Sequence, residues 1–92
     1  MSEALPKSLN LRVITSHEVL VDDVVDEVSI PSLDGYLGIL PGHRNLLVAL
    51  GKGAIEYRKD QFKKHVDVSG GYARIQPGNV LVFTDLEKDE PG

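Results

Sequence analysis

The chain has 92 residues, a formal net charge of -4, 41% hydrophobic residues and no cysteine. This length holds one domain, and the composition is typical of a folded protein rather than a disordered one. The lack of cysteine excludes disulfides, zinc–thiolate sites, iron–sulfur clusters and thiol nucleophiles, and the acidic charge argues against a freestanding nucleic-acid binder. The longest wholly apolar run, residues 46–50, is too short to span a bilayer, so we expect no direct bilayer insertion.

Short strands are predicted along most of the chain. Residues 9–13 alternate apolar and polar side chains, which is the period of a half-buried strand. Similar strand-like segments follow at residues 18–21, 24–30, 36–40, 46–50, 53–59, 62–68, 72–76 and 80–84. We expect Pro31 to end the third strand, because proline cannot donate a hydrogen bond to a neighbouring strand.

The segments between these strands are suited to tight turns. The residues that we expect to shape two of these turns are Gly35, Gly38, Pro41, Gly42, Ser69, Gly70 and Gly71. Residues 59–61 are typical of a hairpin tip, and no window of 11 or more residues shows the period of a helix. The number and spacing of the strands therefore predict an all-β fold, either an antiparallel β-sandwich or a flattened barrel.

Two predicted strands, residues 46–50 and 80–83, are apolar on both faces. A strand of an antiparallel sandwich normally turns one face to water. The outer face of these strands is covered either by loops of the same domain or by another subunit, and the sequence alone leaves both possibilities open.

No motif for a chemical reaction stands out. His17, His43 and His65 lie far apart, and none has a second ligand at a spacing typical of a metal site. Ser69 lacks the pattern of a nucleophile elbow. We therefore predict no catalytic residue, no metal and no cofactor, and we favour an interaction module. The alternatives are a cupin-like metal β-sandwich that uses the three histidines and a generic ligand-binding sandwich.

Several short motifs follow one another along the chain in a specific order. Residues 34–43 read DGYLGILPGH, residues 68–72 read VSGGY, and residues 75–80 read IQPGNV. Together they closely resemble the N-terminal domain of the epsilon subunit of F-type ATP synthases, which is called delta in mitochondria. The resemblance covers residues 8–86 and implies a ten-stranded flattened antiparallel β-sandwich, with residues 1–7 and 87–92 as flexible ends.

The resemblance also implies a mechanical, non-catalytic role. In this family the domain belongs to the central stalk, where it binds the gamma subunit and contacts the polar loops of the membrane c-ring. It thereby helps to couple the transport of protons or sodium ions to ATP synthesis. The location implied is the cytoplasmic face of a bacterial inner or plasma membrane, as a peripheral part of the complex.

Individual positions carry over from the family. Asp34 and Tyr36 match the loop that faces the c-ring. For the gamma subunit, we expect contacts from the region after the turn and from the second two-faced strand, at His43, Arg44, Val48, Val80 and Val82.

The chain departs from the family pattern at three places. Tyr36 stands where the family often has an acidic residue, and Arg44-Asn45 replaces the usual Ala-Pro. The family usually continues into a two-helix hairpin that inhibits ATP hydrolysis and, in some bacteria, binds ATP. This sequence ends at residue 92, either as a naturally short subunit or as a truncated one, and for these 92 residues we expect no C-terminal helical hairpin, no inhibition by it and no bound nucleotide.

Overall fold

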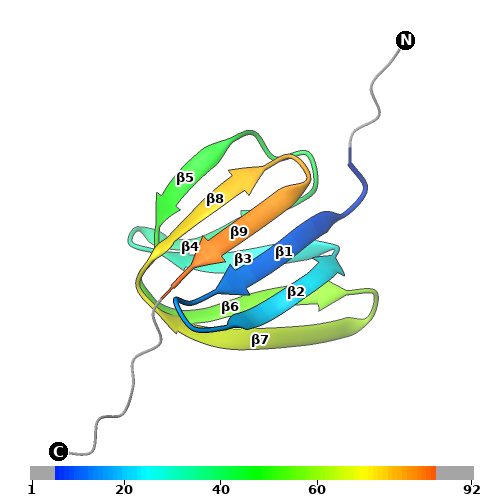
Figure 1. Ribbon diagram of the computed structural model, residues 1–92. Coiled ribbons are helices and arrows are strands. Elements are labelled where there is room, and N and C mark those ends of the chain that lie inside the picture. The colour runs from blue at the N-terminus through cyan, green and yellow to red at the C-terminus, as the bar shows by residue number, and fades with distance from the viewer. Residues whose placement is uncertain (1–5, 85–92) are drawn as a thin grey trace, which may run out of the picture.

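Two β-sheets packed face to face make up the computed structural model, which describes residues 6–84 (Figure 1). One sheet has five strands, in the spatial order β2 (Val19–Val25), β1 (Leu9–Ile14), β9 (Asn79–Phe83), β8 (Tyr72–Gln76) and β5 (Leu46–Ala49). The other sheet has four strands, in the order β4 (Gly35–Ile39), β3 (Glu27–Ser32), β6 (Lys52–Lys59) and β7 (Phe62–Ser69). The prediction of an all-β sandwich is confirmed, with nine strands in the described residues where the resemblance implied ten.

The core lies between the two sheets and is almost entirely aliphatic. Alternating side chains of each strand point inward, as the burial pattern of β1 illustrates, with Leu9, Leu11 and Val13 fully buried. The buried apolar residues come from eight of the strands and from the end of a loop: Leu9, Leu11, Val13, Val21, Val25, Val28, Ile30, Ile39, Leu50, Ile55, Val68, Ala73, Ile75, Val80 and Val82.

The predicted strand at residues 24–30 is in fact two strands in different sheets. The chain leaves the five-stranded sheet after Val25 and enters the four-stranded sheet at Glu27. At the crossing point, the Asp26 N–H donates to the carbonyl oxygen of Arg58 at 2.7 Å. Sequence alternation does not report such a change of sheet, because the apolar side chains on both sides of Asp26 enter the same core.

Proline does not end β3 as we expected. Pro31 lies within β3, paired with Tyr36 of β4, and is buried. Its carbonyl oxygen accepts a hydrogen bond from the Gly51 N–H at 2.8 Å, which ties this end of β3 to the residue before β6.

One strand pair is parallel, which corrects the prediction of a wholly antiparallel fold. The first strand, β1, pairs with the last, β9, from Asn10–Asn79 to Ile14–Phe83. Every other strand pair is antiparallel. No local hairpin turn constrains the direction of β1 and β9, because the whole domain lies between them in sequence.

The turn between β7 and β8 requires two glycines. Gly70 and Gly71 have φ values of 81° and 108°, in the region that favours glycine. A Cβ at Gly71 would overlap the carbonyl group of Phe83. The buried Thr84 hydroxyl donates to the Gly70 carbonyl at 2.7 Å, so the turn is held against the end of β9.

Candidate interaction surfaces

The β3–β4 hairpin ends in a tip formed by Leu33 and Asp34. The Ser32 hydroxyl accepts a hydrogen bond from the Asp34 N–H at 3.2 Å and donates to the Gly35 carbonyl. Gly35 has a φ of 120°, and the Leu33 N–H donates to the Ala49 carbonyl at 3.2 Å, which ties the tip to the end of β5. Leu33 itself is 71% exposed. The tip is therefore a braced turn that presents an apolar side chain and a carboxylate.

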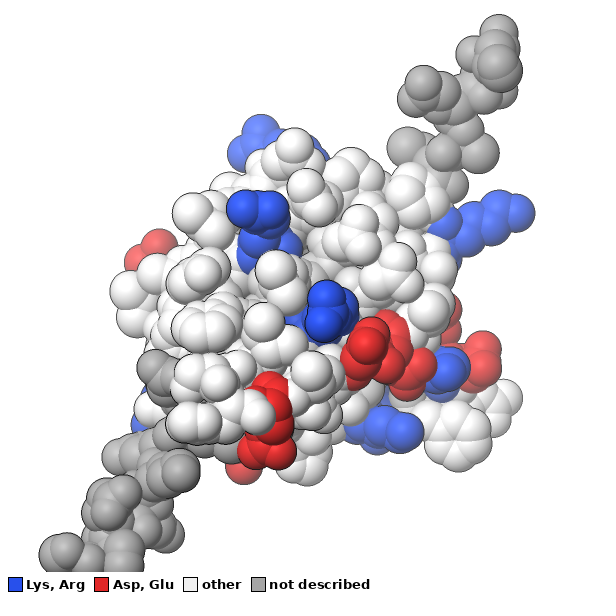
Figure 2. All heavy atoms as spheres, viewed as in Figure 1, with Lys and Arg blue, Asp and Glu red and all other residues white. Residues whose placement is uncertain are grey.

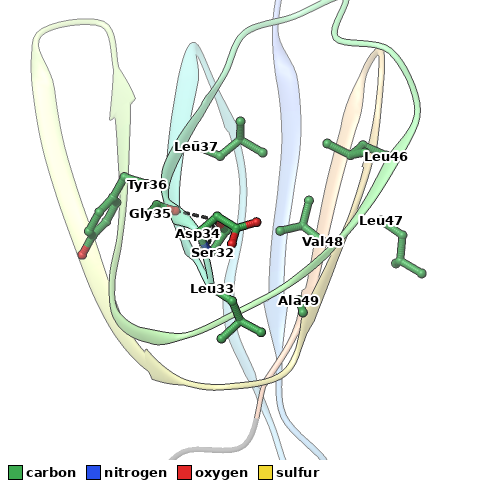
Figure 3. A pocket seen from close by; sticks show the side chains of 10 residues that line it. All are labelled: Ser32, Leu33, Asp34, Gly35, Tyr36, Leu37, Leu46, Leu47, Val48 and Ala49. Carbon is green, nitrogen blue, oxygen red and sulfur yellow. Dashed lines mark hydrogen bonds between the residues drawn. The ribbon is translucent and has the colours of Figure 1, made fainter.

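Asp34 and Tyr36, both assigned to the ring-facing loop, point in different directions. Figure 3 shows Asp34 on the side of the tip that faces β5, whereas Tyr36 turns away from β5. Between the tip and β5 lies an open groove of about 600 Å³, whose walls include Leu37 and Val48. The structure thus separates two residues that sequence reasoning had treated as one contact.

The loop between β4 and β5 is held in place by backbone hydrogen bonds. The Gly42 N–H donates to the Pro77 carbonyl at 2.8 Å, so the two glycine–proline motifs of the sequence meet in space. Gly42 has a φ of 90°, whereas Gly38 lies inside β4 and so is not a turn residue. Within the loop, His43 Nδ1 lies 2.8 Å from the Arg44 carbonyl oxygen, to which it donates.

Val80 and Val82 are not surface residues, which corrects their assignment to a gamma interface. Their side chains are 1% and 0% exposed and belong to the core between the sheets. Val48 is half-buried and packs against that core. On the same strands the side chains that face outward are Leu81 and Phe83 on β9 and Leu47 on β5. The sequence identified the strands that are apolar on both faces, but on β9 the residues assigned to the interface are the ones that point into the core.

An apolar face covers part of the outside of the five-stranded sheet. The strand register places Phe83 between Ile14 and Tyr72, and places Leu81 between Arg12 and Arg74, with Leu47 beyond Arg74. We call this surface the outer apolar face and define it by Ile14, Leu47, Tyr72, Leu81 and Phe83.

The outer apolar face is exposed and slightly hollowed. Leu47 is 68% exposed and Tyr72 is 48% exposed. The rings of Tyr72 and Phe83 have centroids 5.8 Å apart. A shallow hollow of about 640 Å³ lies over β5 and β8 beside Arg74. Figure 2 shows this side of the molecule as largely uncharged over β5, β8 and β9, with isolated basic groups within it and acidic groups over β2.

The outside of the four-stranded sheet has the opposite character. Its cross-strand pairs include Glu56 with His65 and Arg58 with Lys63. Arg58 Nη2 also lies 3.1 Å from Glu27 Oε1. Charged side chains on a sheet face are typical of contact with water, so the two outer faces of the sandwich differ in kind.

Ion pairs connect the two sheets where β2 passes β6. Lys59 Nζ on β6 lies 3.0 Å from Asp23 Oδ1 on β2, and Arg58 Nη1 lies 3.5 Å from Asp26 Oδ2. The hydrogen bond from Lys59 lowers the pKa of Asp23 below its ordinary value of 3.8. The same bond raises the pKa of Lys59 above its ordinary value of 10.5. Burial raises the pKa of the neighbouring Tyr57 hydroxyl above 10.0.

The three histidines lie on separate elements. His17 is in the turn between β1 and β2, His43 is in the loop after β4, and His65 is on β7. Within residues 6–84, no group of three or more histidine, aspartate or glutamate side chains is arranged to hold a metal ion. The same residues contain no helix long and apolar enough to cross a membrane.

Fold and surface together define a class: a small two-layer β-sandwich domain with one charged and one apolar outer face. Residues 8–86 match the family described as the beta-sandwich domain of the ATP synthase delta/epsilon chain, and the chain belongs to this family. The resemblance seen in the sequence is thereby confirmed.

Named relatives agree with this family. The chain is 40% identical over 82 residues to the ATP synthase epsilon chain of Solibacter usitatus, covering 89% of this chain and 61% of that one. It is 41% identical over 78 residues to the ATP synthase epsilon chain of a Synechococcus strain, covering 85% of this chain and 57% of that one. The chain therefore spans about 60% of the length of these relatives.

Solved structures share the fold. A chain in the Euglena gracilis mitochondrial ATP synthase structure, which contains OSCP, F1 and the c-ring, superposes with a TM-score of 0.83 at 24% identity, over 91% of this chain and 54% of that one. A chain in the central stalk and c-ring of the Tetrahymena thermophila enzyme gives a TM-score of 0.70 at 11% identity, over 91% of this chain and 67% of that one. At these identities the superpositions establish the fold.

Proposed function

We propose that this domain is a non-catalytic subunit-binding module of the central stalk in a rotary F-type ATP synthase. The observation that carries the proposal is the outer apolar face, which sits opposite a charged and solvated face on the same sandwich. Exposed apolar patches of this kind mark protein–protein contacts. The family of the chain and the names of its relatives give the assembly in which such a contact would form.

The outer apolar face is the proposed binding surface for the gamma subunit. It includes the exposed Leu47 and the neighbouring rings of Tyr72 and Phe83, and aromatic side chains are favoured at the centres of interfaces. Arg74 lies beside Leu47 and forms no ion pair within residues 6–84, so an acidic group of the partner would complement it. His43 and Arg44 would lie at the rim of this contact, whereas Val48 faces the groove on the inner side of β5.

The tip of the β3–β4 hairpin is the proposed contact with the polar loops of the c-ring. It is a short, hydrogen-bonded turn whose position is fixed by its bond to β5. A rigid sandwich with one surface on gamma and another on the ring transmits rotation between them, and in this way takes part in coupling proton or sodium-ion transport to ATP synthesis. The domain would then be peripheral, at the cytoplasmic face of a bacterial membrane.

A binding experiment with purified gamma subunit tests the main contact. We expect Leu47→Asp to weaken binding by about 1–3 kcal/mol, because it places a charge in a desolvated contact. The side chain is 68% exposed, so the isolated domain should keep its fold, as a circular dichroism melt would show.

The matched control is His65→Asp, an exposed position on the charged face. It should bind gamma like the wild-type chain. If Leu47→Asp and the wild type bind gamma with equal affinity, the outer apolar face is not the gamma contact. Loss of binding only in His65→Asp would move the contact to the other sheet.

A further inference from the structure

Tyr36 is 63% exposed, but its side chain is directed towards β6 rather than beyond the hairpin tip. It stands opposite Pro31 on the neighbouring strand β3, and its hydroxyl oxygen accepts a hydrogen bond from the Ala54 N–H on β6 at 3.3 Å. Since the strand order is β4, β3, β6, the side chain must pass over β3 to reach this partner. Figure 3 shows the ring on the side of β4 away from the groove.

The hydroxyl lies where the pairing between β3 and β6 stops. Residues 27–29 pair with residues 56–58, and the pairing does not extend to Pro31. Pro31 has no N–H, and its carbonyl oxygen is used by Gly51. The Ala54 N–H would therefore lack an acceptor on β3. Ala54 is half-buried, and a backbone N–H that is shielded from water destabilises a fold when it has no partner. The Tyr36 hydroxyl supplies that acceptor.

Gly53 makes room for this arrangement. A Cβ at this position would lie 2.7 Å from the Tyr36 hydroxyl oxygen and 3.0 Å from the Pro31 Cβ. Gly53 does not have a positive φ, so its backbone conformation does not require glycine. The space taken by Tyr36 and Pro31 is the physical reason for a glycine here.

We propose that Tyr36 is a positioning residue, which holds the β3–β4 hairpin against β6, and that the contact beyond the tip is made by Leu33 and Asp34. The identity of the partner, the polar loops of the c-ring, rests on the proposed function. The internal role of Tyr36 does not. The proposal accounts for a tyrosine at a position that sequence reasoning had assigned to the ring contact itself.

Amide hydrogen exchange of the 92-residue chain, followed by NMR, tests the internal role. In Tyr36→Phe, which keeps the ring and removes the acceptor, we expect the Ala54 amide to exchange at least about fivefold faster. The matched control is Tyr72→Phe on the other sheet, which should leave Ala54 unchanged. Unchanged exchange at Ala54 in Tyr36→Phe would overturn the proposal.

Gly53→Ala provides a second, independent measurement. The new methyl group should displace the Tyr36 hydroxyl and speed exchange at Ala54 in the wild-type background. In the Tyr36→Phe background it should add little at Ala54, because the acceptor is already gone. If the two substitutions had fully additive effects on the exchange rate of Ala54, they would not both act through the Tyr36 hydroxyl, and the proposal would be contradicted.

Binding to purified c-rings in detergent separates this inference from the proposed function. We expect Leu33→Ser to weaken ring binding about tenfold, and Tyr36→Phe to bind like the wild type. Weaker ring binding in Tyr36→Phe together with unchanged exchange at Ala54 would make Tyr36 a direct contact and overturn the proposal. If the wild-type chain binds no ring, the ring contact of the proposed function is wrong, while the exchange results still decide the role of Tyr36.

Discussion

Single residues hold this fold at places where the backbone passes close to another strand. Gly71 is the clearest case, because its φ is 108° and a side chain would overlap the Phe83 carbonyl. Gly53 is a second case, in which the obstacle is the side chain of Tyr36. Gly38, by contrast, lies in a regular strand with nothing within 4 Å of a Cβ built on it. The same residue type is therefore required at some positions and incidental at others.

Alanine at Gly71 and at Gly38 should have opposite consequences. We expect Gly71→Ala to lower the free energy of unfolding by about 2–4 kcal/mol, because both φ and the Phe83 carbonyl oppose a Cβ. Gly38→Ala should change it by less than about 0.5 kcal/mol. Urea unfolding of both variants measures the difference, and equal stabilities would show that the turn relaxes around a methyl group.

At the scale of a single strand, β9 divides its side chains between the core and the outer apolar face. Val80 and Val82 point inward, and Leu81 and Phe83 point outward. As a central strand, β9 pairs with both β1 and β8, so its position is fixed from both sides. Alternation along a strand puts adjacent residues in opposite environments, which makes this strand a direct test of both core and interface.

Aspartate at two adjacent positions of β9 should separate stability from binding. Val82→Asp buries a charge in an aliphatic core, and we expect it to abolish folding of the isolated domain. Leu81→Asp should leave a folded domain that binds gamma at least about tenfold more weakly. Circular dichroism and a gamma binding assay measure the two effects. A folded Val82→Asp domain, or full gamma binding by Leu81→Asp, would contradict this division.

At the scale of the whole molecule, ion pairs connect two sheets that pack together mainly through apolar contacts. Asp23 on β2 and Lys59 on β6 come from different sheets, and each shifts the pKa of the other towards its charged form. The lowered pKa of Asp23 stabilises the fold above pH 3.8, and this contribution is lost as the pH falls through the lowered value. The raised pKa of Lys59 stabilises the fold below pH 10.5 and is lost as the pH rises past the raised value.

The melting temperature should therefore fall at both ends of the pH range. The raised pKa of Tyr57 adds to the alkaline fall, because partial burial of the hydroxyl favours its neutral form. We expect Asp23→Asn to flatten both slopes, since it removes the partner that shifts Lys59. Asp22→Asn, at a more exposed carboxylate 4.0 Å from Arg12, is the matched control and should keep the wild-type profile. Identical profiles for the wild type and Asp23→Asn would exclude the pair as a link between the sheets.

The sequence predicted most of the fold correctly but fewer of the surface residues. Alternation and turn residues placed most strands within a few residues of their observed bounds, and the motifs around Pro41 and Pro77 identified the family. The boundary between β2 and β3 at Asp26 was missed, because the apolar side chains before and after the change of sheet point into the same core. The inward direction of Val82 was missed because β9 is apolar on both faces, so alternation of apolar and polar residues cannot show which face points into the core.

Local patterns by themselves determined that this chain is all-β with short turns and left a sandwich or a flattened barrel open, since alternation and turn chemistry act between neighbouring residues. Tertiary structure alone decided the parallel pairing of β1 with β9, the orientation of Tyr36 over β6, and which half of each two-faced strand is buried. The physical reason is the same in each case. These features depend on contacts between residues that are far apart along the chain, and the spacing of residues in the sequence carries no information about which distant surface they will meet.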